Sequence, residues 1–299
     1  MIKYKQEFLC CGGKRMNSRS RFQDLTIRNG FMFSAVMLRE DNSKKFLEML
    51  LQVPIKEVVV SYEKSLIYNP ECKGVRLDVY IKDDKNTRYD IELQVAHQEL
   101  GKRTRYYHSQ MDMDLLESGQ EYKELPMSYV IFICDFDPFK KGKYCYTFEN
   151  RCLEEFALDM GDESRSIFLS TEGKDGDKIP KELRAFLEFI KTDNAQNNIE
   201  TEDDYVKELQ KTIRSIKENR ELERSFMTWE DIRREARWEG KLEGKREAIM
   251  ELLEDLGIIP EELKNRIMSE TKEEELKLMF KFASKATSFE DFKDNISTM

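Results

Sequence analysis

The sequence predicts an α/β fold in which helices pack against a mixed sheet, followed by a helical C-terminal region. Two alternating strands fill residues 74–95, and further apolar strands follow with helices between them. From about Thr201 the sequence becomes highly charged and helical. We therefore expect a disordered N-terminal extension at 1–23, an α/β domain at 24–200 and a charged helical region at 201–299.

The elements before the alternating strands are two helices and a strand. Asn29 is placed to cap the first helix, which runs to Leu38, and Asn42 or Ser43 is placed to cap the second. Residues 57–63 are rich in Val and Tyr, which predicts a strand. Residues before this patterned region lack periodicity, so we expect them to lie outside the fold.

The clearest pattern is the alternation on both sides of a polar DDKN turn, which predicts a β-hairpin with one apolar and one polar face. The apolar positions are Val75, Leu77, Val79, Ile81, Tyr89, Ile91, Leu93 and Val95, and the polar face carries Arg76, Asp78, Tyr80, Arg88, Asp90, Glu92 and Gln94. A register centred on Lys85 places Asp78 opposite Glu92, and Arg76 opposite Gln94. A register shifted by two leaves the two carboxylates diagonal.

The remaining elements follow from periodicity and from Gly and Pro positions. We expect helices at 98–118, 179–190, 201–257, 260–269 and 272–285, and strands at 127–134, 143–150 and 165–170. Gly119 ends the first of these helices, and Pro180 opens the second.

Composition narrows the class of protein. A net charge of -9 argues against a protein that coats nucleic acid by bulk charge, but it is compatible with an enzyme that has a local basic groove. No apolar run approaches the ~18 residues of a membrane span, so we expect no membrane partner. Six Cys without a spaced framework favour a reducing cytoplasm, and two His argue against a zinc site.

The opposed carboxylates of Asp78 and Glu92 favour a metal site. At hairpin distances they repel one another, and a divalent cation between them removes that penalty. Mg²⁺ suits the site because it takes one or two carboxylates together with waters and phosphate oxygens. The alternative is a solvated strand face in which Arg76 and Arg88 neutralise the acids without metal.

The same residues resemble a known family. RLDVYIKDDKNTRYDIELQV (76–95) resembles the active-site hairpin of the PD-(D/E)XK nuclease superfamily, in the variant where Gln replaces the Lys of the E-x-K motif. The closer resemblance is to its Rpn-type family, the recombination-promoting nuclease/putative transposase group. Further segments resemble that family in the same order from about residue 24 to 285: LTIRNGFMFSAV (25–36), KRTRYYHSQM (102–111), VIFICDFDPF (130–139) and WEGKLEGKREA (238–248).

The resemblance implies a PD-(D/E)XK restriction-endonuclease-like core, with a mixed sheet flanked by helices, and Mg²⁺-dependent DNA cleavage, with Mn²⁺ as the alternative metal. It implies that Asp78, Glu92 and Gln94 are the catalytic residues and that Asp78 and Glu92 hold the metal. Gln94 stands at the lysine position. Since an amide takes up no proton near pH 7, we expect Gln94 to orient the attacking water or to contact a phosphate oxygen.

Arg103 and Tyr107 are the expected substrate-binding residues. They lie four apart on one helical face, and a guanidinium there can bind a phosphate through two hydrogen bonds. The alternative is an Arg stem that covers a Tyr at the surface. Superfamily members often use a further acid from the first helix, for which Glu40 and Glu48 are both candidates.

The C-terminal region contains a four-residue repeat with Glu239, Glu243 and Glu247 beside Gly240 and Gly244. We favour a flexible, solvated helix with charged stripes. The alternative is that the glycines permit close helix packing in a homodimer.

Two functions compete. The leading one is a metal-dependent DNA endonuclease linked to recombination or mobile elements. The rival is a catalytically inactive nuclease-like module that acts in DNA or protein binding and assembly. The presence of Asp78, Glu92 and Gln94 together favours the enzyme.

Overall fold

The computed structural model describes residues 22–66, 75–192 and 201–297. It contains two compact units, which meet in sequence between Glu223 and Arg224. Most of the predicted N-terminal extension lies outside the described residues, but its end belongs to the fold. Phe22 is fully buried, and the Gln23 amide donates to the carbonyl of Lys217 at 2.8 Å.

The first unit is built on a six-stranded mixed sheet with the order β1-β2-β3-β4-β6-β5. The strands are β1 (Val58–Leu66), β2 (Val75–Asp83), β3 (Arg88–Gln94), β4 (Ser128–Cys134), β5 (Cys145–Phe148) and β6 (Ser164–Ser170). β1, β2 and β3 are antiparallel neighbours, β3, β4 and β6 run parallel, and β5 is antiparallel to β6. The predicted mixed sheet is therefore confirmed.

Of the registers compatible with the alternation, the hairpin formed by β2 and β3 has the one centred on Lys85. Val79 pairs with Ile91 and Lys82 with Arg88, so the pairing is centred on Lys85. The turn is held by Asp83, whose carboxylate accepts the backbone N–H groups of residues 85 and 87 at 2.9 and 2.8 Å. The side chain of Arg76, predicted to lie opposite Gln94, is outside the described part of the structure.

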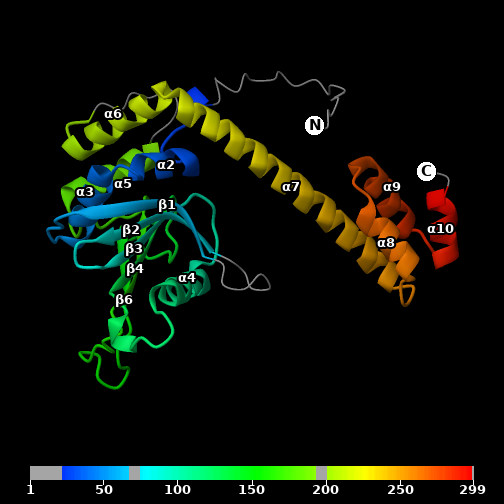
Figure 1. The fold of residues 1–299 in the computed structure, drawn as a ribbon, viewed down its shortest axis with the longest axis horizontal. Coiled ribbons are helices and arrows are strands. Elements are labelled where there is room, and N and C mark those ends of the chain that lie inside the picture. Colours follow the sequence, from blue (N-terminus) through cyan, green and yellow to red (C-terminus); the bar gives the residue numbers. More distant parts are fainter. Residues whose placement is uncertain (1–21, 67–74, 193–200, 298–299) are drawn as a thin grey trace. The chain divides into compact units, whose positions relative to one another are not determined.

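Helices cover both faces of the sheet (Figure 1). One side carries α2 (Gly30–Met37), α3 (Glu40–Leu51), α5 (Lys181–Thr192) and α6 (Asp204–Glu218), and the other carries α4 (Leu100–Leu115). A short 3-10 helix, η1 (Tyr122–Glu124), lies between α4 and β4. The Tyr205 hydroxyl of α6 donates to the carbonyl of Asn42 at 3.0 Å. Because of this packing α6 belongs with the sheet, and the first unit extends beyond the boundary predicted at residue 200.

The first two helices confirm one predicted cap and correct another. The Asn29 side chain accepts the backbone N–H groups of Phe31 and Met32, as an N-cap does. Asn42 and Ser43 do not cap α3, because that helix already begins at Glu40. Instead they are buried within it and donate to carbonyls near the end of α2, which lack partners within their own helix.

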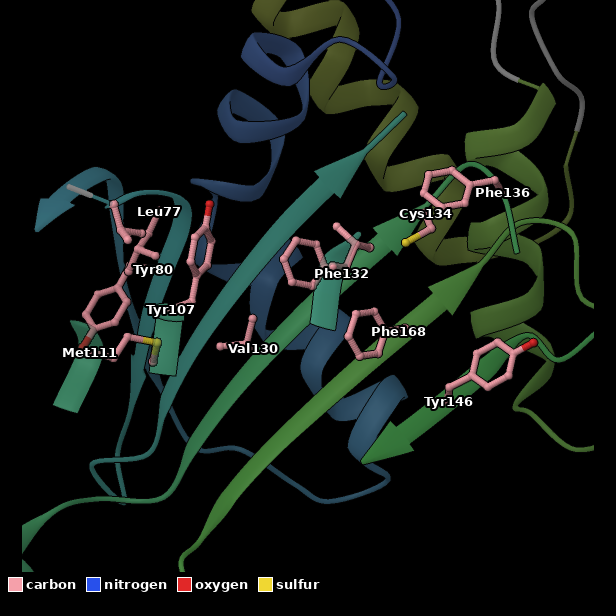
Figure 2. Packing of buried hydrophobic residues seen from close by; sticks show 12 residues of the cluster. Leu77, Tyr80, Tyr107, Met111, Val130, Phe132, Cys134, Phe136, Tyr146 and Phe168 are labelled. Atoms are coloured by element: carbon pink, nitrogen blue, oxygen red, sulfur yellow. The ribbon is translucent and has the colours of Figure 1, made fainter. Parts of the chain in front are cut away.

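The polar face of the hairpin is buried, so the alternative of a solvated strand face does not describe it. Tyr80, Asp90, Glu92 and Gln94 are each at most 8% exposed, because α4 packs over this face. Tyr107 and Met111 of α4 join a cluster with Phe132 and Phe168 (Figure 2). The predicted division into two faces is wrong for Val75 and Leu77, which share a cluster with Tyr80 and with Tyr107 and Met111 of α4. The alternation also could not show that the polar face is covered.

The second unit contains the C-terminal helices. The sequence from residue 201, which was predicted to form one helix, is broken at Asn219, where α6 ends. The Asn219 side-chain oxygen accepts backbone N–H groups from the first turn of α7 (Arg220–Glu254). α8 (Glu261–Ser269) and α9 (Glu273–Ala283) match the prediction, whereas α10 (Phe289–Ser297) was not predicted. Leu242 and Ile249 of α7 share a core with Phe292 of α10. Among the described helices, none has the length and apolar composition needed to span a bilayer.

Candidate functional site

The candidate site lies where β2 and β3 run side by side beneath α4. The backbone N–H of Asp78 donates to Glu92 Oε1 at 3.0 Å, which links the two acidic positions across the hairpin. Glu92 is 2% exposed and Gln94 is 8% exposed, whereas Asp78 is half-buried. The structure therefore brings together the three residues predicted to be catalytic.

α4 adds Arg103 and Tyr107 to this group. The Arg103 guanidinium donates to Glu92 Oε2 at 2.6 Å, to Gln94 Oε1 at 3.1 Å and to the Tyr107 hydroxyl at 2.7 Å. It also lies over the rings of Tyr107 and Phe132, 4.8 and 5.4 Å from their centroids. Because Tyr107 is buried and Arg103 reaches into the site, the alternative of a surface Arg stem covering a Tyr does not describe this pair.

Hydrogen bonds to both the nitrogen and the oxygen of the Gln94 amide fix its orientation. Its nitrogen donates to the carbonyl of Ala96 at 2.7 Å, and its oxygen accepts from Arg103. The side-chain oxygen therefore faces the same guanidinium as Glu92. An oxygen in this position acts as an acceptor or as a ligand for a cation.

Asp90 lies beside Glu92 and was not among the predicted site residues. It is fully buried on the same strand face as Glu92, and neither carboxylate oxygen has a hydrogen-bond partner among the described residues. The alternation placed Asp90 on the polar face, but the E-x-K-like motif of β3 includes only Glu92 and Gln94. A buried carboxylate without partners is costly unless it is neutralised by a proton or by a nearby cation.

Burial controls the electrostatics of this face. It raises the pKa of Glu92, with a further contribution from the negative charge of Asp78, while the Arg103 guanidinium, 2.6 Å from Oε2, acts in the opposite direction. Burial also holds the pKa of Asp90 well above its usual range, and Glu92 and Asp78 add to the effect. One guanidinium therefore does not fully compensate three neighbouring carboxyl groups.

The residues present fit a hard divalent cation. Within the described part of the chain, no three His, Cys, Asp or Glu side chains converge on a point as a closed cage would require. Mg²⁺ does not need such a cage, because it is commonly held by one or two carboxylates with waters and substrate phosphates. Asp78 and Glu92 would supply those carboxylates, and the Gln94 oxygen faces the same guanidinium as Glu92 Oε2.

The two candidates for a further acid lie elsewhere. Glu40 is exposed at the start of α3, and the carboxylate of Glu48 accepts the backbone N–H of Ile55 at 2.9 Å. α3 is on the side of the sheet opposite α4 (Figure 1). Neither residue is brought to Asp78 and Glu92 in this structure.

A separate hollow of about 500 Å³ lies on another face of α4. Its lining includes Arg105 and His108 of α4 together with Phe168 of β6, and it excludes the predicted catalytic residues. His108 is buried there against three serine hydroxyls, at 3.0 to 3.2 Å, so it is a core histidine.

Comparison with known proteins agrees with this geometry. The profile of a family described as PD-(D/E)XK nuclease family transposase matches residues 28–243. No curated protein and no solved structure matches the chain. The matched region covers more than half of the chain and contains the whole sheet, the hairpin acids and α4. The chain therefore belongs to the PD-(D/E)XK nuclease family transposases and has their α/β core.

Proposed function

We propose that this protein is a Mg²⁺-dependent DNA endonuclease that acts in recombination or on mobile elements, with Mn²⁺ as an alternative metal. The observation that carries the proposal is the buried Glu92 beside Asp78, on a hairpin covered by an Arg-bearing helix. Burying these acids is costly unless a cation compensates them, so their position favours function over structural stability.

Each site residue has a role in phosphodiester hydrolysis. Asp78 and Glu92 would hold the metal, which supplies an activated water and charge stabilisation when bound. Gln94 has no proton to exchange near neutral pH, so it orients a water or contributes its oxygen as a ligand. Arg103 is suited to a phosphate oxygen, and the Tyr107 hydroxyl holds the guanidinium side chain in place.

We further infer that the protein works in the cytoplasm on DNA. Cys134, Cys145 and Cys152 are free thiols, as expected in a reducing compartment. For α7 we propose a solvated helix with charged stripes, and a homodimer that packs on its glycines is the alternative assembly. Adding a Cβ at Gly240 or Gly244 meets nothing within 4 Å among the described residues, so this chain makes no close packing there itself.

The test is nicking of supercoiled plasmid, and cleavage of linear and single-stranded DNA, in Mg²⁺ and in chelator. We expect cleavage in Mg²⁺, none in chelator, and none by Asp78→Asn in either condition. Glu57→Gln removes an exposed carboxylate just before β1 and serves as the control, with cleavage unchanged. DNA binding without cleavage of any substrate would favour the inactive nuclease-like module instead.

A further inference from the structure

The Arg103 guanidinium occupies the position where the proposed site would place a cation. It reaches Glu92 Oε2 at 2.6 Å and Gln94 Oε1 at 3.1 Å, so it lies between two oxygens that belong to the predicted catalytic set. Gln94 is fixed in this orientation because its nitrogen is bonded to the carbonyl of Ala96. A positive charge is therefore already held between these two oxygens without any metal.

Both oxygens of Glu92 are in use in this arrangement. Oε1 accepts from the backbone of Asp78 and Oε2 accepts from Arg103. A divalent cation on Oε2 would stand beside the guanidinium, and the two positive charges would repel strongly in a site with little water. Metal and Arg103 therefore compete for Glu92.

The Arg103 side chain also makes contacts away from Glu92. Its Nε bonds the Tyr107 hydroxyl at 2.7 Å, and its guanidinium lies over the rings of Tyr107 and Phe132. These contacts do not depend on Glu92. The Arg103 side chain is also 31% exposed, so its end can turn outward while Tyr107 still holds it.

We propose that Arg103 is an internal competitor for the metal position, and that it leaves Glu92 when a divalent cation binds. In the metal-free protein it compensates Glu92 and orients Gln94. Once released, it remains on Tyr107 and presents its guanidinium to a DNA phosphate. This proposal rests on the proposed metal-dependent function, and it gives Arg103 a positioning role before its role in substrate binding.

The experiment is calorimetric titration of the full-length protein with Mg²⁺ in the absence of DNA. Removing Arg103 deletes the competing charge, so Arg103→Ala should bind Mg²⁺ about tenfold more tightly than wild type. Arg105→Ala removes the same charge two residues along α4, from an exposed side chain that lines the separate hollow, and should bind as wild type does. Arg103→Lys keeps the charge but lacks the planar fork, so its affinity should lie between those of wild type and Arg103→Ala.

The outcomes separate the two proposals. If wild type and all variants fail to bind Mg²⁺, the proposed function itself is wrong. If wild type binds Mg²⁺ but Arg103→Ala binds equally or more weakly, Arg103 is not a competitor and the proposed function stands. Equal tightening by Arg105→Ala would also overturn the inference, because the effect would then be one of general charge. Circular dichroism checks the fold of each variant. If Arg103→Ala does not fold, the Mg²⁺ affinity of Arg103→Lys decides: tighter binding than wild type supports the inference, and equal or weaker binding overturns it.

Discussion

His108 provides a quantitative test of how α4 is fixed to the sheet. Its ring nitrogens lie 3.0 Å from the Ser128 hydroxyl, 3.2 Å from that of Ser164 and 3.2 Å from that of Ser166. Burial lowers the pKa of His108 to about 4 from an ordinary 6.5, and Asp162 opposes the shift only in part. His108 is therefore neutral at pH 7, and it anchors the helix that carries Arg103.

The sign and size of the effect follow from linkage. Since the folded-state pKa lies below that of the unfolded chain, the unfolded chain takes up the proton first as pH falls. His108 then lowers the free energy of unfolding progressively between pH 6.5 and about 4, by a total of about 3 kcal/mol, because each pKa unit is worth about 1.4 kcal/mol. The loss is complete below the folded-state pKa.

The assay is urea denaturation of metal-free wild type and His108→Gln from pH 7.5 to 4. Asp112 lines the same hollow, and its pKa is raised by burial and by Asp162, so its contribution to the pH dependence of stability has the opposite sign. The difference between the two pH curves isolates His108, whatever constant cost the substitution carries. If the two curves stay parallel over this pH range, His108 does not resist protonation and the reasoning is refuted.

Three further outcomes are expected. Gln94→Ala should reduce single-turnover cleavage on the order of 10²-fold, since a positioning group is worth a few kcal/mol of barrier; loss of Mg²⁺ binding in calorimetry would instead make its oxygen a ligand. Asp90→Asn should raise the melting temperature in chelator, because it removes a buried carboxylate that lacks partners, and a lower melting temperature would contradict this. A fragment of residues 1–223 should fold and cleave DNA, whereas 1–200 should be destabilised because it lacks α6, which packs against α2 and α5; two fragments of equal stability by urea denaturation would show that this packing is dispensable.

The hairpin was predictable because its signal is local. Alternation and a short turn allow only registers in which Asp78 and Glu92 are opposite or diagonal, and so these two residues could be placed together from spacing alone. The Asn29 cap was predictable for the same reason, because it depends on residues within one turn.

Other features depend on contacts between distant segments. The sequence does not show that α4 covers the polar face, and so the burial of Asp90 and the reach of Arg103 toward Glu92 could not be foreseen. The assignment of α6 to the first unit depends on Tyr205 meeting Asn42, far away in the chain. The break at Asn219 was missed because the charge pattern continues across it.

The central claim is that Asp78 and Glu92 hold the metal that cleaves DNA. The most direct measurement is single-turnover cleavage of plasmid DNA at increasing Mg²⁺ by wild type, Glu92→Gln and Glu57→Gln. We expect that cleavage by wild type and Glu57→Gln rises with Mg²⁺ and saturates, while Glu92→Gln remains inactive at every concentration with its fold intact. Cleavage by Glu92→Gln at the wild-type rate and matched Mg²⁺ would contradict it.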